Sequence, residues 1–114
     1  SPLAGGRLSG KYINGKQSNN SRYVLWPQRF NRNKTKRGEN AIKKYVNLAK
    51  KYNIKPSTFA NAFVLSRPFL TSNIIGATTL SHLEENINSL NINFTEEMIN
   101  DVEDIHLSDP NPCV

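Results

Sequence analysis

Apolar residues recur at three- and four-residue spacing over two stretches in the middle of the chain. The first stretch contains Ala41, Ile42, Tyr45, Val46, Leu48, Ala49 and Tyr52, and the second contains Phe59, Ala60, Phe63 and Val64. This spacing puts the apolar side chains on one face of a helix. The pattern predicts two helices over residues 38–66, the second beginning at Pro56 and ending before Pro68.

A second pair of helices is predicted over residues 79–106. Leu80, Leu83, Ile87 and Leu90 are spaced three, four and three apart. Thr95 is expected to cap the last helix, because two acidic residues follow it in the first turn. The inner face of that helix should carry Met98, Ile99, Val102 and Ile105.

Between the two pairs, the β-branched run over residues 71–75 predicts the only strand, ending at Gly76. A strand flanked by helices cannot pair its own backbone groups. We therefore expect its partners to come from an upstream segment or from another copy of the chain. Residues 1–12 form a glycine-punctuated loop, and residues 13–37 are expected to hold little regular structure apart from an apolar island at residues 23–26.

Length and composition limit the chain to one domain with a modest core, since it has 114 residues and is 37% hydrophobic. Its apolar runs are shorter than the roughly 20 residues of a membrane span. Its one cysteine, Cys113, can form no internal disulfide. This composition favours a reducing, cytoplasmic setting without a membrane partner.

Charge is divided unevenly, because residues 1–55 hold 14 of the 15 Lys and Arg and a single acid. The basic run Arg29, Arg32, Lys34, Lys36 and Arg37 lies near Trp26 and Phe30, which raises the possibility of a nucleic-acid surface. A solvated loop is the simpler interpretation, since no recognised nucleic-acid motif frames the run. We therefore do not expect nucleic acid as a partner.

The sequence Gly76-Ala77-Thr78-Thr79 joins the predicted strand to a predicted helix. Unpaired N–H groups of the first helical turn, the threonine hydroxyls and the positive end of the helix dipole suit a phosphate. The alternative is an ordinary turn with a threonine cap that binds nothing. His82 and His106 have no Cys or His neighbours at metal-ligand spacing, and no nucleophile motif accompanies them. The residues alone thus indicate a possible anion site and no catalytic apparatus.

Two separated motifs resemble those of a known family. Ser1-Pro2-Leu3-Ala4-Gly5-Gly6-x-Leu8-Ser9-Gly10-Lys11-Tyr12 is similar to the loop after the seventh strand of aldo-keto reductases. Ile74-Ile75-Gly76-Ala77-Thr78-Thr79, followed by Leu83-x-Glu85-Asn86, is similar to the eighth strand and cofactor-phosphate helix of that family. The branch that it resembles most includes Tas-like proteins and potassium-channel β subunits.

The resemblance implies an α/β fold in which this chain is the C-terminal third of a (β/α)8 TIM barrel. Alone, the chain would be mostly helical with about one strand. Residues 1–37 would be the loop after strand seven, residues 38–66 helices, residues 71–76 strand eight, and residues 79–106 the cofactor-phosphate and C-terminal helices. The implied activity is NADPH-dependent reduction of a small aldehyde or ketone. The basic first loop favours NADP over NAD, since it suits an additional phosphate.

By the same resemblance, the cofactor-binding residues are Ser1, Pro2, Leu3, Ala4, Lys11, Arg22, Thr78, His82, Glu85 and Asn86. The first four would line the pyrophosphate and ribose, Lys11 and Arg22 would reach phosphates, and Thr78 and His82 would meet the 2′-phosphate. Glu85 and Asn86 would bind the adenine. His82 departs from the glutamine common in relatives, and the alignment around Arg22 is poor.

The family's catalytic Asp, Tyr, Lys and His lie on earlier strands, so the resemblance implies no catalytic residue here. We expect the 114-residue chain alone to be inactive and to self-associate. Two alternatives remain: a nucleotide-sensing regulatory subunit with little turnover, or a basic RNA-binding fragment.

Overall fold

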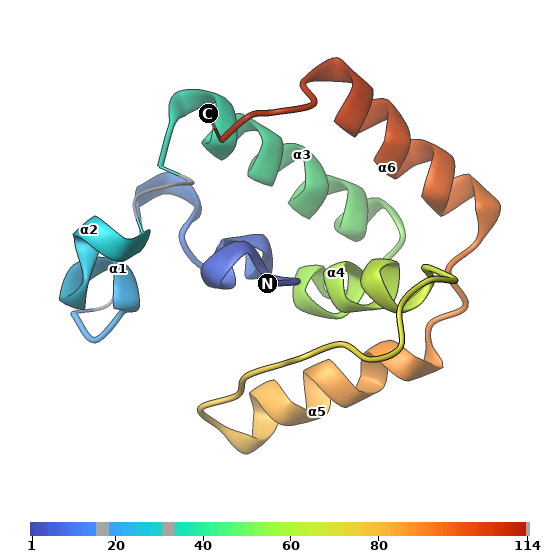
Figure 1. The fold of residues 1–114 in the computed structure, drawn as a ribbon, viewed down its shortest axis with the longest axis horizontal. Coiled ribbons are helices and arrows are strands. Elements are labelled where there is room, and N and C mark those ends of the chain that lie inside the picture. The colour runs from blue at the N-terminus through green and yellow to red at the C-terminus, as the bar shows by residue number, and fades with distance from the viewer. Residues whose placement is uncertain (16–18, 31–33, 114) are drawn as a thin grey trace.

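A computed structural model describes residues 1–15, 19–30 and 34–113. Its longer helices are α3 (Lys36–Lys51), α4 (Pro56–Leu65), α5 (Leu80–Asn88) and α6 (Glu96–Ser108). Its shorter elements are η1 (Ala4–Ser9), η2 (Ile13–Gly15), α1 (Arg22–Leu25), α2 (Pro27–Phe30) and η4 (Ser89–Asn91). α3 and α6 lie side by side, with α4 and then α5 below them and α1 and α2 at one end (Figure 1).

The apolar core lies between α3, α4 and α6. Its buried members are Leu48, Ala49, Phe59, Met98 and Val102. The ring of Phe59 stacks on Tyr52 at 6.2 Å between centroids and lies 4.9 Å from Phe94. Both predicted inner faces of α3 and α6 are therefore confirmed.

Threonine side chains define the starts of three helices. Thr35, Thr79 and Thr95 each accept a hydrogen bond from the backbone N–H three residues later. The cap at Thr95 is as predicted, whereas the cap at Thr35 starts α3 two residues earlier than expected. α4 begins at Pro56, as predicted.

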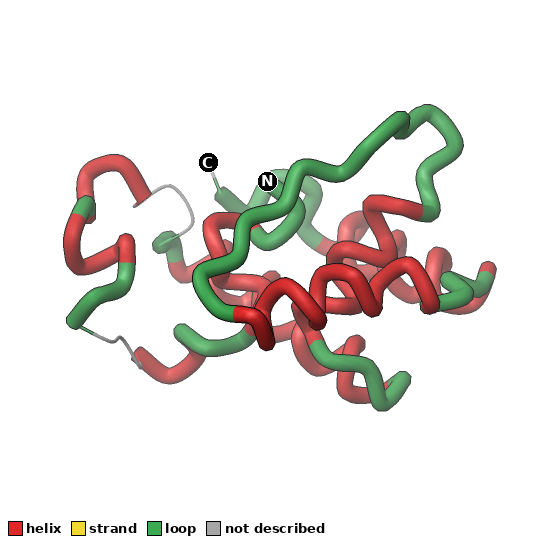
Figure 2. Tube along the Cα trace, turned by 90° about the horizontal axis from the view of Figure 1, so that it is seen from below, coloured by secondary structure: helices red, strands yellow, loops and turns green. Residues whose placement is uncertain are grey.

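The predicted strand is wrong for this chain taken alone, because the structure assigns no strand in the residues it describes. Residues 73–77 form an irregular segment, and Figure 2 shows the connection between α4 and α5 as a long loop. Ile74 is 87% exposed. A strand needs a neighbour for its N–H and C=O groups, and the described residues offer none.

α5 presents its apolar side to solvent. Leu80, Ile87 and Leu90 are exposed, Leu80 by 82%, while the buried positions of α5 and η4 are the polar Asn86 and Ser89. A helix in a complete domain buries its apolar stripe. The exposed stripe indicates a surface that another protein segment would cover.

The expectation of little regular structure over residues 13–37 is also wrong, since η2, α1 and α2 fall there. The physical reason is an aromatic cluster around Tyr23. Its ring makes edge contacts with Tyr12 at 4.8 Å and with Phe30 at 5.9 Å. Of the predicted apolar island at residues 23–26, only Tyr23 is buried.

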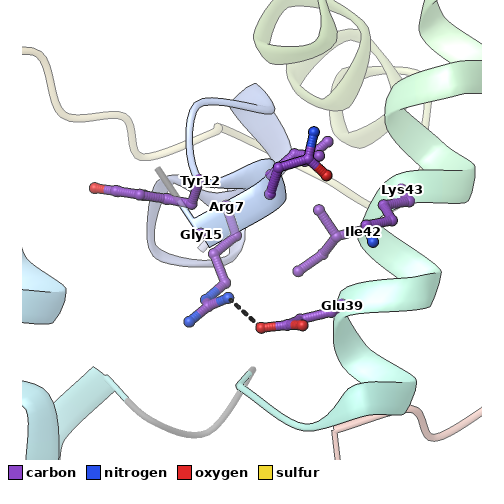
Figure 3. A pocket seen from close by; sticks show the side chains of 8 residues that line it. Arg7, Tyr12, Gly15, Glu39, Ile42 and Lys43 are labelled. Atoms are coloured by element: carbon purple, nitrogen blue, oxygen red, sulfur yellow. Dashed lines mark ion pairs between the residues drawn. The ribbon is translucent and has the colours of Figure 1, made fainter. Parts of the chain in front are cut away.

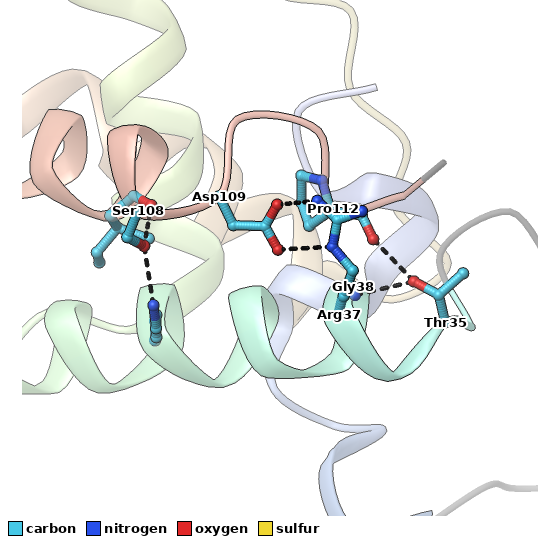
Figure 4. A network of polar contacts seen from close by, with 8 residues as sticks. Thr35, Arg37, Gly38, Ser108, Asp109 and Pro112 are labelled. Carbon is cyan, nitrogen blue, oxygen red and sulfur yellow. Dashed lines mark hydrogen bonds and ion pairs between the residues drawn. The ribbon is translucent and has the colours of Figure 1, made fainter.

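The C-terminal tail is fixed to the start of α3 (Figure 4). The Thr35 hydroxyl donates to the carbonyl of Pro112 at 2.8 Å, and the Arg37 guanidinium pairs with both carboxylate oxygens of Asp109. Hydrogen bonding to Arg37 lowers the pKa of the Asp109 carboxyl. Lys44 adds a hydrogen bond to Ser108 at 2.8 Å. These contacts hold α6 along α3.

We predict that Phe59→Ala lowers the free energy of unfolding by about 3–5 kcal/mol, because it leaves a cavity in the core. Phe69→Ala is the matched control: Phe69 is exposed, so its loss should change stability by less than about 0.5 kcal/mol. Urea denaturation followed by circular dichroism measures both. Equal effects of the two substitutions would contradict the assignment of the core.

Candidate functional site

The amino end of α5 is an exposed set of hydrogen-bond donors. Thr79 has extended backbone angles, and its Oγ1 accepts a hydrogen bond from the N–H of His82 at 3.2 Å. Thr78 Oγ1 lies 3.3 Å from His82 Nδ1. First-turn N–H groups have no partner within their helix, and the dipole adds positive potential there. The arrangement can therefore receive an anion.

One helical turn further along, Glu85 is held in place by the start of α4. Its two carboxylate oxygens accept hydrogen bonds from Lys55 Nζ at 2.8 Å and from Ser57 Oγ at 2.7 Å. The bond from Lys55, followed by that from Ser57, lowers the pKa of the Glu85 carboxyl. Glu85 is thus an oriented, ionised acceptor.

Asn86 lies next to Glu85 and is only 6% exposed. Its Oδ1 accepts a hydrogen bond from Asn61 Nδ2 at 2.9 Å, and its Nδ2 donates to the carbonyl of Gly76 at 3.4 Å. The first bond joins α5 to α4, and the second joins α5 to the segment that precedes it. Four of the predicted site residues therefore lie along one helix, α5, and the turn that leads into it.

The first loop is a compact turn built on glycines. Gly5 and Gly6 have φ of 68° and 94°, and a Cβ on Gly5 would come within 2.7 Å of the Tyr23 hydroxyl. Ser1 Oγ accepts from the N–H of Gly5 at 3.3 Å, and the Tyr23 hydroxyl donates to the carbonyl of Ala4 at 3.1 Å. The loop thus brings its backbone close to an aromatic side chain.

The remaining predicted residues lie around this loop. Ser1 and Pro2 line a cleft of about 420 Å³ between the loop and the core helices. Leu3 is half-buried, and its carbonyl accepts from the N–H groups of Gly6 and Leu8. Lys11 Nζ lies 5.1 Å from the centre of the Tyr12 ring, and the Arg22 guanidinium lies 5.3 Å from that of Phe30.

The ten predicted residues form two groups. The loop group packs against α4 through η1, and the helix group packs against α4 through α5. In Figure 1, η1 lies beside α4, and α5 runs below it. Contact of a single ligand with both groups stays a prediction.

Sequence reasoning missed Arg7, which is only 5% exposed. Its guanidinium lies 4.3 Å from the centre of the Tyr23 ring and 4.0 Å from the carboxylate of Glu39. Figure 3 shows this pair beside a pocket of about 270 Å³. Burial is the main cause that raises the pKa of the Tyr23 hydroxyl. The sequence held a signal for the Arg7–Glu39 ion pair, because Glu39 is the only acid among the first 55 residues.

Sequence reasoning also missed the polar side of α4. Ser57, Thr58 and Asn61 are buried and face α5, each through a hydrogen bond to Glu85 or Asn86. Asn61 follows Ser57 by four residues and Thr58 by three, and these separations put it on the same helical face as both. That spacing was present in the sequence, but the helix was predicted from its apolar stripe alone.

Three further observations concern the metal, nucleic-acid and membrane chemistry considered from the sequence. Within residues 1–15, 19–30 and 34–113, no group of three or more His, Cys, Asp or Glu side chains could hold a metal ion. Of the basic run, Arg37 is paired with Asp109, and Arg32 lies outside the described residues. No helix in the described part of the chain is long and apolar enough to cross a membrane.

Comparison with known proteins places these motifs in a family. A sequence model of the aldo/keto reductase family matches residues 1–106. Protein tas of Escherichia coli K12 is 36% identical over 104 residues, which cover 91% of this chain and 30% of that protein. An aldo-keto reductase of Babesia bovis is 39% identical over 89 residues, covering 75% of this chain and 31% of that protein. The uncharacterized oxidoreductase YrpG of Bacillus subtilis is 30% identical over 105 residues, covering 92% of this chain and 30% of YrpG.

The chain spans about 30% of the length of these relatives. The family match over residues 1–106 nevertheless includes both motifs, the glycine loop at residues 1–12 and the segment that leads into α5. The chain therefore belongs to the aldo/keto reductase family.

Proposed function

We propose that residues 1–114 are the C-terminal, cofactor-binding part of an NADPH-dependent reductase of small aldehydes or ketones, which we call the parent enzyme. The observation that carries this proposal is the line of polar groups along α5, from the Thr78–His82 pair to Glu85 and Asn86. The fold of the parent enzyme would be a TIM barrel, in which this chain supplies the loop and helices after strand seven, strand eight and the helices that follow it.

The residues present fit a phosphorylated dinucleotide. The amino end of α5 offers exposed N–H and hydroxyl donors to a phosphate, and Lys11 and Arg22 are exposed cations. Glu85 and Asn86 lie about 9 and 10.5 Å along the helix axis from its capping residue Thr79, at about 1.5 Å per residue. Acceptor and amide groups at that distance suit the adenine of the same ligand.

When bound, NADPH would supply the hydride that the carbonyl carbon receives. The residues of this chain would hold its phosphates and adenine and so orient it. The proton for the carbonyl oxygen would come from a tyrosine upstream of this chain. The exposed cations Lys11 and Arg22 support the preference for NADP, because Lys and Arg are suited to an additional phosphate dianion.

We further propose that the exposed apolar side of α5 is covered by strands of the barrel in the parent enzyme. The apolar side chains of α5 and of the segment before it (Ile74, Ile75, Leu80, Leu83 and Ile87) are exposed in the chain alone. Apolar patches of this kind drive association in water.

We predict that the isolated 114-residue chain forms dimers or larger oligomers through this apolar side. The double substitution Leu80→Lys with Ile87→Lys should shift the chain to monomer, because charged side chains oppose burial of the patch. Leu107→Lys is the control, since Leu107 is exposed on α6 instead. Sedimentation velocity measures the states, and a compact wild-type monomer at high concentration would contradict the proposal.

We predict that Lys11→Met in the parent enzyme weakens NADPH binding by about 1.5–3 kcal/mol, the scale of a hydrogen bond to a charged group. NADH binding should weaken less if Lys11 contacts the 2′-phosphate, and equally if Lys11 contacts the pyrophosphate. Titration of nicotinamide fluorescence measures both cofactors.

Lys50→Met is the matched control for this experiment, because Lys50 is exposed near the end of α3, away from the loop. It should leave both affinities unchanged. An unaltered NADPH affinity in the Lys11→Met enzyme would remove Lys11 from the site.

A further inference from the structure

Three asparagine side chains form a directed chain of amide hydrogen bonds through the centre of the α4–α5 contact. Asn73 Nδ2 donates to Asn61 Oδ1 at 3.0 Å, and Asn61 Nδ2 donates to Asn86 Oδ1 at 2.9 Å. Asn86 Nδ2 then donates to the carbonyl of Gly76 at 3.4 Å. Asn61, in the middle, has no exposed surface.

Direction matters in this chain, because each amide has one carbonyl and one NH₂ that are not interchangeable. Turning the Asn86 amide by half a turn would place its NH₂ against the NH₂ of Asn61 and its carbonyl against that of Gly76. Both contacts would then be repulsive in a site from which water is largely excluded. Asn61, through the shorter of the two bonds, and the Gly76 carbonyl together fix which way the Asn86 amide points.

The fixed amide retains capacity for a ligand. After the Asn86 amide has bonded to Gly76 and Asn61, one of its N–H groups and one lone pair of its Oδ1 are still unused. An amide N–H and carbonyl together match the edge of adenine, which offers the N7 acceptor and the N6 amino donor. Hypoxanthine offers an oxygen in place of that amino group, so the carbonyl of Asn86 would meet a second acceptor.

Resting on the proposed function, we propose that Asn61 is a positioning residue that makes the site prefer adenine over hypoxanthine by orienting Asn86. This role also explains why the polar side chain of Asn61 is fully buried on α4, a helix whose other side is apolar. Without Asn61, only the longer bond to the Gly76 carbonyl would orient the Asn86 amide, so the preference for adenine would weaken.

The test uses the parent enzyme with two probes, NADPH and its deaminated analogue, in which hypoxanthine replaces adenine. Wild type should prefer NADPH. Asn61→Leu, which keeps the volume and removes the amide, should reduce the ratio of the two dissociation constants by about fivefold, the size of one neutral hydrogen bond. Asn47→Leu is the matched control, because Asn47 is exposed on α3, and it should leave the ratio unchanged.

A second variant covers the case in which Asn61→Leu fails to fold. Asn73→Ala removes only the bond that orients the Asn61 amide, at a half-buried position, and should reduce the same ratio in a smaller degree. A purely structural role of Asn61 would weaken both probes alike and leave the ratio at its wild-type value.

An unchanged ratio in either folded variant would overturn the proposal while leaving the proposed function intact. If wild type binds neither probe, the proposed function itself fails. The wild-type titration alone therefore separates the two failures.

Discussion

The structure depends on α4 having two faces of different chemistry. One face inserts Phe59 into the apolar core with α3 and α6, where burial supplies non-directional stabilisation. The other face presents buried hydroxyl and amide groups to α5, where each hydrogen bond fixes an orientation. Because α5 makes its contacts through directional bonds, its helix terminus and its Glu85–Asn86 pair are held at a defined angle to the rest of the chain.

Much of this arrangement could be predicted from hydrophobic periodicity and capping residues. The helical spacing around Leu48 and Val102, Pro56 as a helix start and Thr95 as a cap all have local causes, and the structure confirms them. Resemblance to a family added the site residues, which no local pattern could have assigned to one ligand. Their joint role stays a prediction, since the loop group and the helix group reach α4 through different elements.

The errors arose where an element depends on partners outside the described chain or far away within it. The run at Thr71–Ile75 has strand composition, yet composition cannot supply a neighbouring strand. Tyr23 organises short helices over a polar segment through contacts with Tyr12 and Phe30, which single-sequence periodicity does not reveal. The polar face of α4 could have been found from residue spacing, but the apolar stripe on the same helix is the stronger signal for a buried face.

We propose that these residues bind the cofactor and that residues upstream of them transfer the proton. The direct measurement is the rate at which purified residues 1–114 oxidise NADPH in the presence of an aldehyde, with the parent enzyme as the positive control. We expect no carbonyl reduction and only weak NADPH binding by the isolated chain, because under the proposed function it would supply one side of the cofactor site without the upstream tyrosine. Steady reduction of the aldehyde by the isolated chain would contradict it.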